Sequence, residues 1–140
     1  ERGAAAVEFA ILVPVLVMIV FGTIYFSLFF NAAQGAQAAA REGARVASLR
    51  GSSANAACLA AKDALAGTSV DTNSATFGVA AGSAPTAFSS DCSVSSTAVF
   101  PCVKGVGNVY VTVKAAVTFA VPFVLSGAQN INTTARFRCE

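Results

Sequence analysis

The side chains that carry the most chemistry in this chain are four cysteines, because the sequence contains no histidine. No two of the cysteines are as close as a C-x-x-C pair, since they lie at Cys58, Cys92, Cys102 and Cys139. Zinc sites are typically built from such close pairs, so the spacing argues against a bound metal. An even number of cysteines in a small domain rich in Ser, Thr and Gly favours an oxidising compartment and two disulfides.

The acidic residues do not form a catalytic pattern. No two of the seven carboxylates lie close together in sequence. They are Glu1, Glu8, Glu42, Asp63, Asp71, Asp91 and Glu140. With no histidine and with oxidised cysteines, acid–base and nucleophilic catalysis lack their usual groups. The sequence also has no phosphate loop or dinucleotide fingerprint, and its net charge of +2 is too small to indicate nucleic-acid binding. We therefore expect no enzyme, no cofactor and no nucleic-acid partner.

The strongest structural signal is an uncharged apolar run at residues 9–30, with Glu8 at its N-terminal edge. About 20 apolar residues span the hydrocarbon core of a bilayer as a helix. The run therefore lies in a membrane or is buried among the helices of a multi-chain assembly. The residues expected to form this membrane or filament-core helix include Phe9, Leu12, Pro14, Leu16, Phe21, Ile24, Phe26, Phe29 and Phe30.

The same helix is expected to continue from residue 4 to residue 49, a length of about 70 Å, which is more than twice the bilayer core. Pro14 should kink it or open one backbone hydrogen bond. Beyond residue 30, small residues recur four apart, in the stripes Gly35, Ala39, Gly43, Ala47 and Ala32, Ala36, Ala40, Ala44. Such stripes allow close packing on another helix. The alternative is an Ala-rich helix that packs only within its own domain.

A polar stripe accompanies the small residues and is expected to face water or polar partners, at Gln34, Gln37, Arg41, Arg45 and Ser48. Residues 51–53 break the helix, and residues 54–66 are expected to form a short second helix with Cys58 on its apolar face. This division gives an assembly helix at residues 1–50 and a disulfide-stapled surface domain at residues 51–140.

The period of the pattern changes to two in the rest of the chain. Strict alternation predicts a half-buried strand at residues 109–121, ended by Pro122 and Gly127, and another strand at residues 130–139. A weaker strand is expected within residues 70–79, and a loop at residues 82–96. The predicted fold class is therefore α+β, with a long N-terminal helix, a short helix and a small antiparallel sheet.

Four cysteines allow three disulfide pairings. Cys58 lies on the inner face of the second helix, and Cys139 lies on the inner face of the last strand. A helix packed on the sheet would bring these two together, which favours Cys58–Cys139 with Cys92–Cys102 closing a local loop.

Glu8 has two interpretations. It is either an acidic residue in the first turns of a helix that needs no partner, or a carboxylate that requires a cation once its helix is buried. Arg2 is six residues away, on a different face of the helix, so the cation would come from a neighbouring copy as Arg2 or an N-terminal amine.

Three segments resemble TadE-like proteins, of the tight-adherence branch of the type IV pilin-like proteins. These are R-G-A-A-A-V-E-F-A at residues 2–10 with Pro14 after it, A-R-E-G-A-R at residues 40–45, and T-A-R-F-R at residues 134–138. The first two cover the first 50 residues well, and the third is a looser match. The resemblance implies a prepilin peptidase that cuts after Gly3, five residues before Glu8.

The resemblance implies a structural subunit of an extracellular, adhesive pilus that waits in the cytoplasmic membrane before assembly. Its partners would be copies of itself, the membrane, the assembly machinery and the peptidase. A minor subunit that initiates or tips the pilus is a rival interpretation. A single-span receptor is a second rival, although a receptor stalk has no need of small-residue stripes just outside the bilayer.

Overall fold

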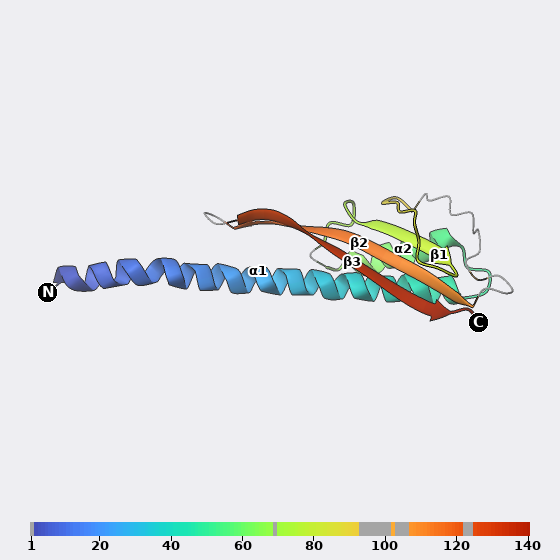
Figure 1. The fold of residues 1–140 in the computed structure, drawn as a ribbon, viewed down its shortest axis with the longest axis horizontal. Coiled ribbons are helices and arrows are strands. Elements are labelled where there is room, and N and C mark those ends of the chain that lie inside the picture. Colours follow the sequence, from blue (N-terminus) through green and yellow to red (C-terminus); the bar gives the residue numbers. More distant parts are fainter. Residues whose placement is uncertain (1, 69, 93–101, 103–106, 122–124) are drawn as a thin grey trace.

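The computed structural model describes residues 2–68, 70–92, 102, 107–121 and 125–140. Its elements in chain order are α1 (Arg2–Ser48), α2 (Ala54–Leu65), β1 (Thr76–Ala81), β2 (Asn108–Val121) and β3 (Leu125–Arg138). The N-terminal end of α1 extends far beyond the other elements, whereas its C-terminal half is packed against them (Figure 1). We call the part of the chain from residue 31 onward the head. It consists of the C-terminal half of α1, α2 and the sheet. The predicted α+β architecture is confirmed.

Helix α1 has 47 residues and continues without interruption through Pro14. It ends at Ser48, whose Oγ donates a 2.7 Å hydrogen bond to the carbonyl of Arg45. Gly51 follows with a φ of 78°, which only glycine adopts at little cost, so the chain can turn back there. Helix α2 then begins behind Ser53, whose side chain accepts a hydrogen bond from the Ala56 N–H at 3.1 Å.

The three strands form one antiparallel sheet in the order β1-β2-β3. The predicted strand at residues 109–121 is confirmed as β2, and its inward residues Val109, Val111 and Val113 are fully buried. The C-terminal strand is longer than predicted, because Gly127 pairs with Phe119 inside β3 instead of ending a strand. An edge strand has one unpaired side and tolerates glycine there.

The weaker strand begins later than the expected residue 70. The side chain of Asp71 accepts from the Asn73 N–H, and its carbonyl accepts from the Ala75 N–H, so residues 71–75 form a turn before β1. The expected loop is confirmed over its described residues 82–92. It returns to β1, where Phe77 and Ser89 exchange two backbone hydrogen bonds of 2.8 and 3.0 Å. The rest of that loop and Pro122 lie outside the described residues.

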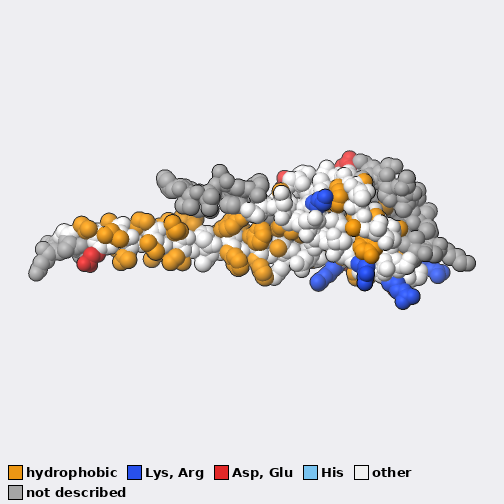
Figure 2. Space-filling model, in the orientation of Figure 1, with side chains coloured by type: hydrophobic (Ala, Val, Ile, Leu, Met, Phe, Trp, Pro, Cys, Tyr) orange, Lys and Arg blue, Asp and Glu red, His pale blue; other side chains and the backbone are white. Residues whose placement is uncertain are grey.

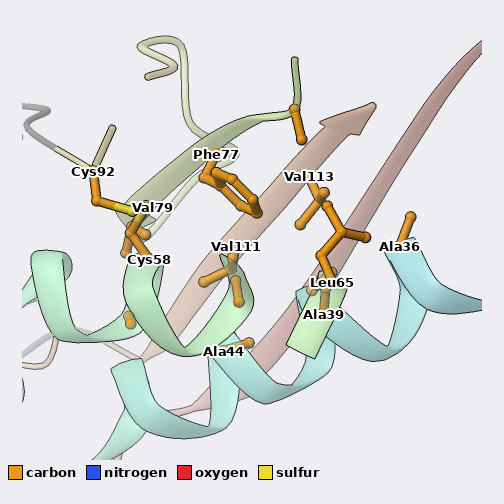
Figure 3. Close-up of a cluster of buried hydrophobic side chains, with 14 of the residues drawn as sticks. Ala36, Ala39, Ala44, Cys58, Leu65, Phe77, Val79, Cys92, Val111 and Val113 are labelled. Atoms are coloured by element: carbon orange, nitrogen blue, oxygen red, sulfur yellow. A yellow bond between two sulfur atoms is a disulfide. The ribbon is translucent and has the colours of Figure 1, made fainter. Parts of the chain in front are cut away.

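The core of the head lies between α1, α2 and the inner face of the sheet (Figure 3). The buried apolar positions of α1 are alanines and a glycine, with Val46 partly buried beside them, while the bulkier buried side chains come from the other elements, among them Leu65, Phe77 and the inward valines of β2. The small side chains let α2 and β2 lie close to α1.

The predicted disulfide pairing is wrong. The structure joins Cys58 to Cys92 and Cys102 to Cys139, with Cα–Cα distances of 5.6 and 5.5 Å. The alternating pattern identified the inward faces correctly, but it could not tell which strand lies beside α2. Helix α2 contacts β1, whereas β3 lies at the other edge of the sheet, so Cys58 meets the loop after β1.

The second pairing follows from the register of β2 and β3. Asn108 at the start of β2 pairs with Arg138 at the end of β3, so the chain entering β2 lies beside Cys139. Cys102 is in that entering segment and reaches Cys139 there.

Peptide mapping of the unreduced protein should recover Cys58–Cys92 and Cys102–Cys139 as the two cross-linked pairs. Recovery of Cys58–Cys139 would contradict the sheet order.

The Cys58→Ala/Cys92→Ala variant should lower the free energy of unfolding of the head by about 3–4 kcal/mol, because it releases a loop closed over 34 residues. Chemical denaturation in detergent measures this difference.

Candidate assembly interface

The N-terminal half of α1 presents a long apolar surface, and most of its described side chains are exposed (Figure 2). Large apolar side chains from Val7 to Phe30 retain 41–68% of their accessible surface. Every large apolar side chain predicted for the core helix is exposed except Phe29, which is half-buried. Full burial of one such side chain is worth about 1.5–3 kcal/mol, so this surface requires an apolar environment outside the chain.

The length and composition of α1 suit a membrane. The segment Ala6–Ser48 contains a stretch apolar enough to cross a bilayer, and none of that stretch is buried against the rest of the chain. A core helix of a water-soluble domain would be mostly buried. Among the described side chains, all the buried positions of α1 lie between Ala32 and Ser48, so the two halves of α1 have different environments.

Glu8 lies at the N-terminal edge of the apolar surface with an exposed side chain. Among the residues whose side chains are described, no cation forms an ion pair with it. The side chain of Arg2 lies outside the described set, so a pairing of Glu8 with Arg2 of a neighbouring copy stays a prediction.

The structure places the small-residue stripe inside the head, which corrects its interpretation as a contact between copies. Ala39, Gly43 and Ala47 are buried. A Cβ added at Gly43 would come within 2.9 Å of the Ala57 carbonyl, and one added at Gly35 would meet the Thr68 side chain. The small residues do pack closely on a helix, but that helix is α2 of the same chain. This agrees with the alternative interpretation, in which the Ala-rich helix packs only within its own domain.

The A-R-E-G-A-R segment divides between two faces of α1. Ala40, Gly43 and Ala44 are buried, whereas Arg41 and Arg45 are exposed. Arg45 donates two hydrogen bonds to the carboxylate of Glu42, at 2.7 and 3.0 Å.

The hydrogen bond from Arg45 is the main cause that lowers the pKa of Glu42. A carboxyl group whose pKa is lower in the folded state than in the unfolded state stabilises the folded state at pH values above its unfolded pKa. That contribution is lost as the pH falls through the folded pKa. Both side chains are largely exposed, so solvent screening keeps the effect small.

An open groove between α1 and β3 is a feature that the sequence did not reveal. Its cavity volume is about 340 Å³, and it is lined by Gln37, Arg41, Thr133, Thr134, Ala135, Arg136 and Phe137. The alternating pattern indicated the faces of β3, but the groove depends on which helix lies next to that strand.

The described residues contain no group of three or more metal-ligating side chains. All four cysteines are in disulfides. The geometry therefore offers surfaces for association, namely the apolar half of α1 and the polar face of the head.

Residues 3–45 match the model of the TadE-like protein family. This segment is TadE-like. The match covers the exposed apolar half of α1 and the A-R-E-G-A-R segment. Searches of curated proteins and of solved structures found no match to this chain.

The TadE-like segment supports an association with the tight-adherence pilus, and its apolar helix agrees with a membrane-anchored or pilus-associated location. The TadE-like family is one of pilus components and not of enzymes. The matched segment ends before α2 and the sheet. It nevertheless includes Gly43, which lies against Ala57 and Ala61 of α2, and most of the buried alanines of α1.

Two adjacent alanines of the TadE-like segment provide a matched test of the packing. Ala39→Leu should lower the free energy of unfolding of the head by about 1–3 kcal/mol, because a buried side chain has no room to grow. Ala38→Leu should change it by less than about 0.5 kcal/mol, because Ala38 is exposed. Urea denaturation in detergent compares the two. A normal head in Ala39→Leu, with only assembly lost, would restore the interpretation of a contact between copies.

Proposed function

We propose that this protein is a structural subunit of an extracellular Tad-type pilus, which polymerises through the N-terminal half of α1 and serves in adherence. The observation that carries the proposal is the exposed apolar surface between Val7 and Phe30, which adjoins a folded head through a continuous helix. A single helix anchor would need the same apolar length, but the TadE-like segment favours a pilus component over an unrelated receptor.

In this proposal the apolar half of α1 has two environments in turn. It first lies in the cytoplasmic membrane, where about 20 residues span the hydrocarbon core. The assembly machinery then transfers it into a bundle of α1 helices. The transfer is energetically balanced, because lipid tails and neighbouring apolar side chains are similar environments for Leu and Phe.

The head then lies on the outside of the bundle. It covers one face of the C-terminal half of α1, so that face cannot contact another α1, while most described side chains of the apolar half are exposed. A minor subunit that initiates or tips the pilus would use the same helix. The abundance of the protein in isolated pili distinguishes the two roles.

Two exposed leucines provide a matched test of the apolar surface. Leu16 has 63% of its surface exposed on α1, and Leu59 has 46% exposed on α2. Leu16→Asp should abolish assembly and weaken membrane insertion, because an Asp in the centre of a bilayer costs about 2.5–3.5 kcal/mol. Leu59→Asp should leave both unchanged. Sedimentation and negative-stain microscopy measure assembly. Normal fibres from Leu16→Asp would refute the proposed role of this helix.

Within such a bundle, Glu8 would be buried and would require a cation. We propose that Arg2 of a neighbouring copy supplies it, and a double-mutant cycle tests this pairing. Glu8→Gln and Arg2→Gln should each reduce assembled mass strongly, and the double variant should lose little more than either one alone. Independent, additive losses would show that the two residues do not interact.

A further inference from the structure

The charged side chains of the head gather on two opposite edges. Figure 2 shows Lys and Arg side chains along the edge formed by α1 and β3, whereas the acidic side chains visible on the head lie at the other edge. The basic edge consists of five exposed arginines, at Arg41, Arg45, Arg50, Arg136 and Arg138. The acidic edge consists of exposed aspartates beside α2 and β1, at Asp63, Asp71 and Asp91.

The basic edge has a clear excess of charge. Its two carboxylates are Glu42, which pairs with Arg45, and Glu140, whose main-chain oxygen accepts from Arg50 at 3.0 Å. Arg41 and Arg136 line the groove between α1 and β3 together with Gln37 and two threonines. This groove therefore offers guanidinium groups and neutral donors, which suit a carboxylate.

The acidic edge also includes two lysines, and both have contacts inside the head. Lys62 Nζ donates to the Ser90 carbonyl at 3.2 Å, and Lys114 Nζ lies 3.6 Å from the centre of the Phe88 ring. Asp63 lies on the outer face of α2, and Asp71 lies in the turn before β1.

We propose that the basic α1/β3 edge of one copy binds the acidic α2/β1 edge of the next copy. This inference rests on the proposed function, because it describes how heads pack once their α1 helices form a bundle. The sheet order puts the two edges on opposite sides of each head, so the contact is head-to-tail. Such a heterologous contact repeats without closing when its rotation produces a helix, as a filament requires.

Other anionic occupants of the basic edge fit less well. Arg41 is 11 residues beyond Phe30, so in an upright chain it lies about 16 Å above the hydrocarbon core along the helix axis. Arg45 is about one turn further away, and a Debye length of about 8 Å screens most of the attraction of both arginines to lipid headgroups. In a bundle, Arg41 and Arg45 are on the face of α1 that the chain's own head leaves uncovered, so they are turned toward neighbouring copies.

The contact also constrains the axial offset between copies. Ala61 packs at Gly43 and Thr68 packs at Gly35, so Asp63 lies level with the part of α1 between these two glycines. Arg41 lies between the same two glycines, at about the level of Asp63, and Arg45 lies about one turn further along α1. A contact between Asp63 of one copy and Arg41 or Arg45 of the next therefore displaces the copies along the axis by at most about one turn, roughly 6 Å.

Charge reversal on each edge tests the proposal with full-length protein. Arg41→Glu/Arg136→Glu makes both edges acidic, and Asp63→Arg/Asp71→Arg makes both edges basic. Each variant alone should lose at least about tenfold in sedimented fibre mass. An equal mixture of the two should regain most of it, because each variant then meets a complementary edge on the other. Ser83→Glu/Thr86→Glu, on an exposed loop, lowers the net charge by two while leaving the basic edge intact, and it should assemble normally.

The outcomes separate this contact from the proposed function. Normal assembly of the two single variants would overturn the edge-to-edge contact and leave the filament role standing. A mixture that stays unassembled would also overturn the contact. Failure of the unmodified protein to assemble under every condition would instead refute the filament role.

Discussion

The rest of the structure depends on the close approach of α2 and β2 to the alanine and glycine face of α1. That face is buried from Ala32 to Ala47, and it contributes almost no bulk of its own. The valines of β2, Phe77 and Leu65 occupy the space that larger side chains on α1 would have taken. A head of this size is thus fixed along one half of a long helix, and the other half is left free.

This packing separates two functions along one helix. Residues beyond 31 hold the head, so their small side chains serve folding, while residues 9–30 are mostly exposed and serve association in the proposed filament. The two disulfides stabilise the head at its two edges, because one joins α2 to the loop after β1 and the other joins the entry of β2 to the end of β3. The head can therefore keep its fold whether α1 lies in lipid or among other helices.

Much of this arrangement could be predicted from the sequence, because the signals are local. Helix boundaries followed from the apolar run and the cap at Ser53, and the buried face of β2 followed from strict alternation. The disulfide pairing could not be predicted, since it depends on which strand is beside α2. The sequence also could not show which helix packs on the small residues of α1, because Ala and Gly permit close packing equally well on α2 and on another copy. The groove beside Arg41 and Arg136 could not be predicted either, because it depends on the placement of β3 against α1.

The central claim is that the apolar half of α1 ends in an environment made of other copies of the same helix. A helical reconstruction of assembled fibres by electron cryo-microscopy tests it most directly. The account predicts a continuous core in which residues 9–30 of successive copies pack against one another, with the heads outside. Fibres held together by heads alone, with these residues outside the core or covered by detergent, would contradict it.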